Sequence, residues 1–318
     1  GEAIVSRRLS KLALAEDSPI LNGYFGDSNG WDVFDQVTIG ATAKQGAWRE
    51  AQALIEQEWR RAAQHGFTQA EVDEQLANRR TALKNAVAGV DTRRSENLAD
   101  VLVEAAKGDF VVVRPETSQT LFEAAAPSLD AATVTAAFQN RLSGLGAPLV
   151  RVTSKTPIEG GTDAILAALK ASQQIAVAAP TAATSAAFAY TDFGAPGKVV
   201  SDTRIEDLGI RRVRFANGVM LNIKKTDFQK DVAYLALRID GGTLLSRKED
   251  PTRVALAGSI SLGGLEAHSL DELSSILAGK TVSSSVGSAS DSFGGTARTS
   301  PEDFLLQAQL MAAFVTHP

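Results

Sequence analysis

The sequence predicts an α+β fold with two mixed α/β domains, each a mainly antiparallel sheet packed against a layer of helices. Segments typical of paired strands and of amphipathic helices occur in both halves of the chain. The length of 318 residues exceeds the roughly 250–300 residues at which a single hydrophobic core stops growing. A stretch of small, uncharged residues near the middle separates the two halves.

The first half begins with an amphipathic helix and a β-hairpin. Apolar residues at helical spacing run through EAIVSRRLSKLALA, residues 2–15. The segments PILNGYFG and WDVFDQVTIGATAK show the alternation and the β-branched or aromatic content of paired strands. They predict a hairpin over residues 20–44, with its turn at Asp27–Gly30.

Helices dominate the rest of the first half. One is predicted over residues 47–65, ending at Gly66, and the next over residues 68–89, where Thr68 and Glu71 match a capping box. The pattern then predicts helices Ser95–Ala106, Thr117–Ala125 and Ala131–Leu142, a strand Pro148–Lys155 and a helix Asp163–Ser172. Residues 1–175 are therefore expected to form one domain.

A linker is predicted over residues 176–205. Its first part, AVAAPTAATSAAFA, has small residues, one proline and no charge, so it lacks the large apolar side chains that a core needs. The glycines of GAPGK, Gly194–Lys198, precede VVSD rather than a helix. We interpret them as turns and not as a phosphate-binding loop.

Residues 206–318 are expected to form a second domain with the order β-β-α-α-β-β-α. Two long strands are predicted, RRVRFANGVMLNIKKT with a tight turn at Asn217–Gly218, and DVAYLALRIDGGTLL. The elements that follow are helices Pro251–Leu262 and Leu270–Leu277, strands TVSSSVGSAS and SFGGTART, and a terminal helix capped by Ser300. Lys224 and Lys225 lie near a strand end, where they are expected to protect a sheet edge.

The chain is expected to be part of a longer protein. A helix follows Gly1 at once, without an initiator methionine or a signal-peptide pattern. At the other end, the long apolar stripe of SPEDFLLQAQLMAAFVTHP has no later segment to cover it. We therefore expect residues 206–318 to be a truncated domain.

Composition excludes several classes of function. The net charge of −5 gives no basic footprint for nucleic acid, and the paired arginines are dispersed among acidic residues. No apolar run approaches the roughly 18 residues that a membrane span needs. With no cysteine, the chain forms no disulfide, thiolate metal site or thiol nucleophile, and either an oxidising or a reducing compartment is compatible with it.

The stretch GGLEAHSLDEL, residues 263–273, raises the question of a metal site. His268, Asp271 and Glu272 have the i, i+3, i+4 spacing that places side chains on one helix face. The competing interpretation is helix capping, in which Ser269 is the N-cap and the two acids offset the helix dipole in the first turn. We favour capping, so no metal ligand is predicted here.

Other signals for catalysis have simpler explanations. His65 ends a predicted helix, where a cation interacts with the helix dipole and the last carbonyl groups. His317 lies at the end of the chain and is assigned no role. No G-x-S-x-G nucleophile elbow occurs between a strand and a helix. The sequence therefore predicts no catalytic, metal-binding or cofactor-binding residue in this chain.

Several stretches of this chain occur in the same order as in a known protein family. They are RRLSKLALAEDSPILNGYFG, RRAAQHGFTQAEVDEQL, SLDAATVTAAFQNRL, FAYTDFGAPGKVV, RRVRFANGVMLNIKKTDFQKD and GGLEAHSLDELSSILAGKTVSSSVG. Together they resemble the insulinase/pitrilysin-type (inverzincin) zinc metallopeptidases in their long two-half bacterial form. The resemblance covers nearly the whole chain and implies that it holds the second domain and the third domain of such a protein.

The resemblance also implies where zinc chemistry resides. Members of the family have four related α/β domains, and zinc is held in the first one by an H-x-x-E-H motif and a distant glutamate. This sequence contains no H-x-x-E-H. The counterpart of the zinc helix falls around Arg253–Ala257, whose side chains cannot bind zinc. The chain is therefore expected to be non-catalytic, with zinc only in the parent protein.

Partners and location follow from the same resemblance. The expected substrate is a peptide or unfolded polypeptide, and the expected partners are the catalytic first domain and the fourth domain of the same protein. The expected location is periplasmic or secreted, with the cytoplasm as the alternative. A different interpretation is a structural or assembly subunit that shares the fold without peptidase activity, and a third is a metal-dependent site at His268, Asp271 and Glu272.

Overall fold

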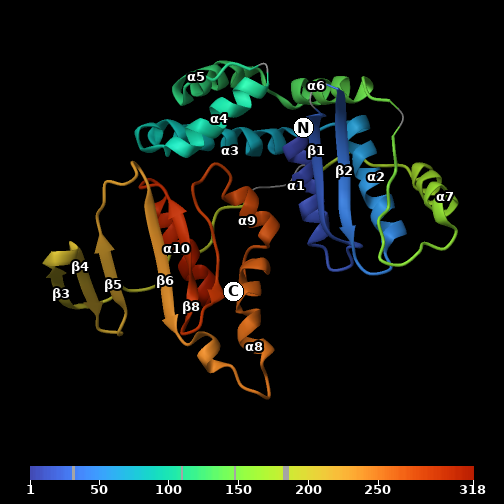
Figure 1. Ribbon diagram of the computed structural model, residues 1–318. Helices are drawn as coiled ribbons and strands as arrows, with labels where there is room; N and C mark the ends of the chain where they lie inside the picture. The colour runs from blue at the N-terminus through green and yellow to red at the C-terminus, as the bar shows by residue number, and fades with distance from the viewer. Residues whose placement is uncertain (31–32, 109, 147, 182–185) are drawn as a thin grey trace. The chain divides into compact units, whose positions relative to one another are not determined.

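The predicted α+β fold class is confirmed by the computed structural model (Figure 1). It describes residues 1–30, 33–108, 110–146, 148–181 and 186–318. In these residues the strands form small antiparallel sheets of order β1-β2, β3-β4-β5 and β6-β8-β7. The chain divides into two compact units, one of residues 1–79 with 122–184 and the other of residues 80–121 with 185–318. The division into domains at residues 175 and 205 stays a prediction.

The first unit opens with helix α1 (Glu2–Ala13) and the hairpin of β1 (Ile20–Gly30) and β2 (Phe34–Ala43), so the predicted helix and hairpin are confirmed. The predicted turn at Asp27–Gly30 is wrong. These residues continue β1 and pair with β2 down to Gly30 opposite Phe34, because the ladder of backbone hydrogen bonds extends beyond them. Residues 31 and 32, between the two strands, lie outside the described residues.

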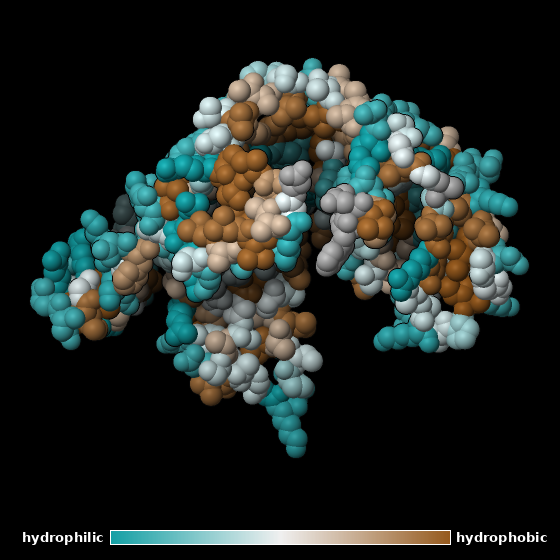
Figure 2. All heavy atoms as spheres, turned by 45° about the horizontal axis from the view of Figure 1, so that its top comes forward, coloured by the Kyte–Doolittle hydropathy of each residue, from teal (hydrophilic) through white to brown (hydrophobic). Residues whose placement is uncertain are grey.

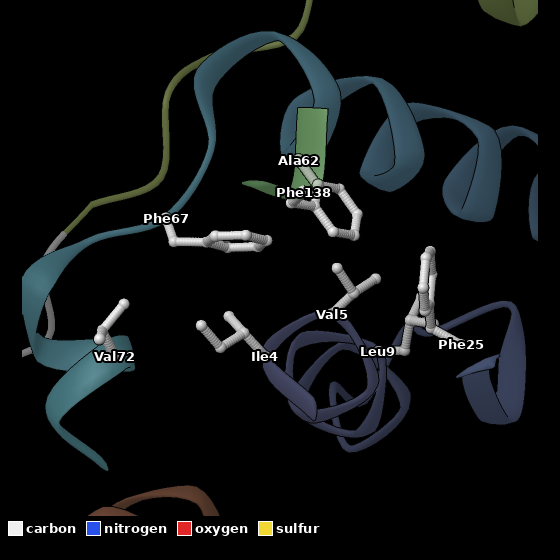
Figure 3. Packing of buried hydrophobic residues seen from close by; sticks show 8 residues of the cluster. All are labelled: Ile4, Val5, Leu9, Phe25, Ala62, Phe67, Val72 and Phe138. Carbon is white, nitrogen blue, oxygen red and sulfur yellow. The ribbon is translucent and has the colours of Figure 1, made fainter. Parts of the chain in front are cut away.

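Each helix of the first unit was predicted, and most of them contribute residues to its hydrophobic core. They are α2 (Trp48–His65), the first half of α3 (Gln69–Ala88), α6 (Ala131–Ser143) and α7 (Gly161–Gln173). Figure 3 shows the core, in which Val5 and Leu9 of α1 lie near Phe25 of the hairpin. The Phe138 ring of α6 lies 5.6 Å from that of Phe25 and 5.1 Å from that of Phe67. Contacts among these three rings thus hold together the hairpin, α6 and the segment that follows α2.

The junction between α2 and α3 follows from local chemistry. Gly66 has φ +67°, and a Cβ there would lie 2.2 Å from the Thr135 side chain, so this position requires glycine. The predicted capping box is confirmed, since the Thr68 backbone N–H donates to Glu71 Oε2 over 2.8 Å and the Glu71 N–H donates to Thr68 Oγ1 over 3.3 Å. The two helices therefore begin and end where the sequence indicates.

The strand predicted over Pro148–Lys155 is wrong. This segment is irregular, and its Leu149 side chain is fully exposed. A strand is stable only when a neighbouring strand satisfies its backbone groups, and the sheet of the first unit contains only β1 and β2 among the described residues. The alternating pattern was present, but none of the described strands pairs with this segment.

In the second unit, β3 (Val199–Ile205), β4 (Ile210–Phe215) and β5 (Met220–Lys224) form one sheet. The turn at Asn217–Gly218 is confirmed, with Gly218 at φ +90° and the Asn217 side chain accepting a hydrogen bond from the Val219 N–H over 3.2 Å. Strand β3 was not predicted and falls in the expected linker 176–205, of which residues 182–185 lie outside the described residues.

The remaining sheet consists of β6 (Ala233–Asp240), β8 (Ser292–Thr299) and the short β7 (Gly287–Ser288). The strand predicted to reach Leu245 ends at Asp240, because Gly241 and Gly242 adopt φ +146° and +61° and lead into a 3₁₀ turn, Gly242–Leu245. Most of the strand predicted over residues 281–290 is wrong, because only β7, Gly287–Ser288, is a strand there. The side chain of Gln307 takes the place of a neighbouring strand at Ser283, as described below.

Helices of the second unit, with the short turns elsewhere in the chain, complete the architecture. The helices are α4 (Ser95–Lys107), α5 (Pro115–Ala125), whose last residues belong to the first unit, α8 (Thr252–Ala255), α9 (Leu270–Ile276) and α10 (Phe304–Thr316). The 3₁₀ turns are Val90–Thr92, Ala126–Ser128, Glu206–Leu208 and Leu256–Leu262. The predicted helix Pro251–Leu262 is thus one α turn followed by a 3₁₀ segment. The terminal helix starts at Phe304 and not directly after Ser300, the predicted cap, although Ser300 Oγ accepts a hydrogen bond from the Asp303 N–H over 3.1 Å.

Candidate functional site

The segment around Arg253–Ala257, where the family resemblance places a degenerate zinc helix, lies on α8 and the start of the following 3₁₀ turn. The Arg253 side chain is largely exposed and lies 4.0 Å from Asp250, and Val254 points into the interior. Neither a guanidinium nor an aliphatic side chain is a zinc ligand. In the described parts of the chain, no group of three or more histidines and acids comes together to hold a metal ion.

His268 is a buried histidine whose ring contributes to packing. Its Nε2 accepts a hydrogen bond from the Ala189 backbone N–H over 2.9 Å. The ring stacks on Phe188 at 6.0 Å between centroids and meets the edge of Tyr190 at the same distance. Because a backbone N–H only donates, Nε2 carries no proton, and its lone pair is already used. This nitrogen is therefore not available to a metal.

The capping interpretation of Ser269, Asp271 and Glu272 is confirmed. Ser269 is the N-cap of α9, its N–H donates to Glu272 Oε2 over 2.8 Å, and its Oγ accepts from the Glu272 N–H over 3.2 Å. The hydrogen bond from the Ser269 backbone holds the pKa of Glu272 below its ordinary value. Asp271 lies in the same first turn. The carboxylate of Glu272 is thus directed to the helix terminus and not to the His268 ring.

Of the other two histidines, His317 adjoins this loop, because its backbone carbonyl oxygen accepts a hydrogen bond from the Glu266 N–H over 3.0 Å. His65, at the end of α2, donates from Nε2 to the Val177 carbonyl oxygen over 2.9 Å, so it binds a neighbouring segment of the first unit. His317 packs against Tyr190 with ring centroids 4.9 Å apart, and its Nδ1 lies 2.7 Å from Thr316 Oγ1. GAPGK forms a turn as predicted, with Gly194 at φ +87°.

The first unit contains a buried ionic cluster centred on Arg8. Its guanidinium donates to Glu71 over 2.5 and 2.8 Å, to Glu58 over 3.2 Å and to the Gly66 carbonyl oxygen over 3.0 Å. Burial disfavours the charge of Glu71, but hydrogen bonds from Arg8 and Thr68 outweigh it and hold its pKa below its ordinary value. Arg61 donates to the second oxygen of Glu58 over 2.5 Å. The buried carboxylates are therefore fully paired, which fits a structural role.

Sequence reasoning did not anticipate an apolar hollow of about 260 Å³ in the first unit. Phe25, Val37, Val134 and Phe138 are among the apolar residues that line it, and an ion pair lies on its wall. Arg141 donates to both oxygens of Asp27, over 2.9 and 2.8 Å, and these hydrogen bonds lower the pKa of Asp27. No local pattern pairs residues 27 and 141, so only the fold reveals this contact.

A second set of contacts that the sequence did not reveal holds the segment before β7 in the second unit. The Gln307 side chain accepts from the Ser283 N–H and donates to the Ser283 carbonyl oxygen, each over 2.8 Å. Asp303 accepts from the Thr281 N–H over 2.8 Å. From the other side, Asn85 of α3 donates to Thr281 Oγ1 over 3.0 Å. These polar contacts fix a strand-like segment without a complete ladder.

The comparisons with known proteins give matches only among solved structures. No protein-family profile matches the chain, and no curated protein matches it. The chain is similar to a mutant of the ferredoxin protease FusC in complex with Arabidopsis ferredoxin, with 15% identity and a TM-score of 0.52 over 99% of this chain and 36% of that one. It is also similar to the periplasmic protease PqqL from Escherichia coli, with 17% identity and a TM-score of 0.47 over 99% of this chain and 35% of that one.

The match to FusC shows a shared fold with a protease. The chain spans about a third of the length of each of these two proteins, 36% and 35%. A structure of the first half of PqqL matches 57% of the chain with a TM-score of 0.45 and 18% identity, and the match covers 39% of that structure. None of the described helices combines the length and the apolar content needed to cross a bilayer.

Proposed function

We propose that this chain is the non-catalytic central portion of a zinc-dependent metalloendopeptidase that cleaves peptides inside a chamber formed by its domains. The observation that carries the proposal is the fold similarity to FusC, a protease, over 99% of this chain but only 36% of FusC. A match to 36% of the protease is less than the half that two whole domains out of four would span, as expected for one complete domain and part of another. In this proposal residues 1–175 are the second domain, 176–205 the linker and 206–318 part of the third.

The chain itself supplies no zinc site in this proposal. Its sequence contains no H-x-x-E-H, and Arg253–Ala257 occupies the position where the family resemblance places the motif's degenerate counterpart. The zinc and the glutamate that activates water belong to another part of the parent protein. The role of this chain is to enclose the substrate and to shape the chamber.

The proposed substrate is a peptide or an unfolded polypeptide. The FusC structure contains ferredoxin, a polypeptide, which supports this class of substrate. The catalytic first domain and the fourth domain of the same protein are the proposed partners. A periplasmic or secreted location is also part of the proposal; it rests on the family resemblance, and fractionation of the cells that make the protein tests it.

The decisive experiment uses the full-length protein. We expect it to cleave an unfolded polypeptide, to contain an H-x-x-E-H motif outside these 318 residues, and to lose activity with a chelator and with glutamate-to-glutamine substitution in that motif. A full-length protein that has no such motif and cleaves nothing would contradict the proposal. That result would favour the structural or assembly subunit instead.

A further inference from the structure

One face of the sheet β3-β4-β5 carries cations and no acid. Successive residues of a strand point to opposite faces, and directly paired residues share a face. Arg212 lies opposite Thr203 on β3 and Asn222 on β5, and Arg214 lies opposite Ser201 and Met220. Lys224 of β5 lies on the same face. We name Arg212, Arg214 and Lys224, with the polar neighbours Ser201, Thr203 and Asn222, the basic face.

The cations of the basic face are exposed and lack acidic partners. In the part of the chain that the structure describes, Arg212, Arg214 and Lys224 take part in no ion pair. Their cross-strand neighbours are uncharged, so nothing on the face offsets the repulsion among them. At the left of Figure 2, where this sheet lies, hydrophilic side chains are mixed with hydrophobic ones.

On the opposite face of the same sheet, an acidic side chain pairs with one of the arginines. Arg211 donates to both oxygens of Asp202, over 3.0 and 2.6 Å, and these hydrogen bonds lower the pKa of Asp202. Arg204 lies directly opposite Arg211 on that face, near the same carboxylate. Val213, also on that face, is buried. The two faces therefore differ in charge balance although they share the same strands.

Protection of a sheet edge does not account for the basic face. Charged residues placed to prevent edge-to-edge pairing belong on edge strands. Lys224 lies on β5, an edge strand, and fits this role, but Arg212 and Arg214 lie on the central strand β4. A protein of net charge −5 gains no solubility from cations gathered on one face. A binding role explains their placement better.

We propose that the basic face docks an acidic segment of a polypeptide, with Arg212 and Arg214 pairing with its carboxylates. Guanidinium groups bind carboxylates with two parallel hydrogen bonds, and residues two apart on a strand are about 6.6 Å from each other, a spacing that an extended acidic segment matches. The proposal concerns binding alone and does not depend on the chain's belonging to a zinc peptidase.

A polypeptide fits the basic face better than a nucleic acid does. Proteins that bind single-stranded nucleic acids stack bases on aromatic side chains, and the basic face has none. Its cations are also few, whereas nucleic-acid-binding domains are strongly basic overall, and this chain has a pI of about 5.4. Carboxylates spaced along an extended chain remain as the matching ligand.

The test measures binding of labelled probes to the 318-residue chain by fluorescence anisotropy at low salt. The probes are a peptide of about 12 alternating glutamates and serines, long enough to span the three cations, a matched lysine and serine peptide, and an oligo-dT of similar length. We expect the acidic peptide to bind, the lysine peptide and oligo-dT to bind much more weakly, and about 500 mM salt to abolish binding.

Substitutions on the two faces of the sheet test whether the acidic peptide binds to the basic face. Arg212→Gln and Arg214→Gln are each expected to weaken binding of the acidic peptide about threefold, and about tenfold together, as the loss of exposed ion pairs implies. Arg204→Gln removes the same charge from the opposite face and is expected to change the affinity by less than about twofold. The double variant Arg212→Lys with Arg214→Lys keeps the charge and is expected to retain most of the binding.

Three results would overturn the proposal. One is an acidic peptide that does not bind at low salt. Another is an Arg204→Gln variant that loses as much affinity as Arg212→Gln, because overall charge would then explain the binding. The third is oligo-dT that binds as tightly as the peptide with the same dependence on Arg212 and Arg214. Thermal unfolding of each variant checks that it is folded. We expect every variant to stay folded, because the substituted positions are exposed.

Discussion

Arg8 is the residue that connects most of the buried charge in the first unit. It joins α1 to Glu58 of α2 and to Glu71 of α3, and its guanidinium lies over the Phe67 ring at 5.4 Å. Glu58 is only 1% exposed, so its charge depends on Arg8 and Arg61. Breaking a buried ion pair leaves an uncompensated charge, which costs more than the pair contributes.

Glu71→Gln is expected to lower the free energy of unfolding by about 2 kcal/mol at neutral pH, because it weakens both the capping box and the pair with Arg8. The pKa of Glu71 is lowered in the folded state, so its stabilisation is fully present above the ordinary glutamate pKa and is lost as the pH falls through the lowered pKa. Urea unfolding as a function of pH checks this.

The matched control is Asp73→Asn on the same helix, where the exposed carboxylate only accepts from Gln69 over 2.8 Å. We expect it to cost less than about 0.5 kcal/mol, as exposed contacts usually do. A Glu71→Gln variant whose stability declines with acid as steeply as that of the wild type would contradict the role assigned to Glu71.

His268→Phe separates packing from hydrogen bonding at the His268 ring. Phenylalanine keeps the contact with Phe188 but leaves the Ala189 N–H without its acceptor, so the free energy of unfolding is expected to fall by about 1–2 kcal/mol. Zinc content measured by mass spectrometry is expected to stay the same as in the wild type. A variant that loses bound metal would revive the metal site at His268, Asp271 and Glu272.

Local capping chemistry was readable from the sequence, whereas long-range contacts were not. Ser269 with Glu272 and Thr68 with Glu71 are three residues apart, so their hydrogen bonds follow from the helix start itself. Asp27 and Arg141, in contrast, meet only because the hairpin and α6 pack together. The roles of such residues depend on tertiary structure, which the pattern along the chain does not encode locally.

At the scale of elements, α10 organises the second unit through two buried polar side chains. Gln307 is fully buried and binds the backbone of Ser283 on both sides, and Asp303 binds the Thr281 N–H. These contacts occupy backbone groups that a neighbouring strand would otherwise pair. They explain why the predicted strand 281–290 is reduced to β7.

Gln307→Leu is expected to lower the free energy of unfolding by about 2 kcal/mol, because the substitution keeps the volume but removes both hydrogen bonds to Ser283. Gln309→Ala on the same helix loses one weaker hydrogen bond, 3.3 Å long, to Thr191 and serves as the control. Thermal unfolding of the two variants measures the difference. Equal losses of stability in the two variants would contradict the role assigned to Gln307.

Helices were predicted more reliably than strands, for a physical reason. A helix satisfies its backbone within one segment, so apolar spacing and caps identify α2 and α3 directly. A strand requires a neighbour, and Pro148–Lys155 has the pattern but no partner, whereas β3 has both and was mistaken for linker. The β-branched residues of VVSDTRI were the signal that could have identified β3.

At the scale of the whole molecule, the chain shares its fold with part of a protease. Of the candidate metal residues, Glu272 takes part in capping and His268 in packing, and the segment Arg253–Ala257 holds an arginine and aliphatic side chains. The sequence alone indicated both the fold class and the expected lack of ligands in that segment. The apolar hollow and the basic face required the structure.

The most direct test of the account is zinc content and peptidase activity of the 318-residue chain by itself. After incubation with zinc and dialysis, we expect far less than one zinc per chain and no chelator-sensitive cleavage of an unfolded polypeptide, because no described cluster of histidines and acids is arranged to hold the ion. One tightly bound zinc per chain, together with cleavage that a chelator abolishes, would contradict the account.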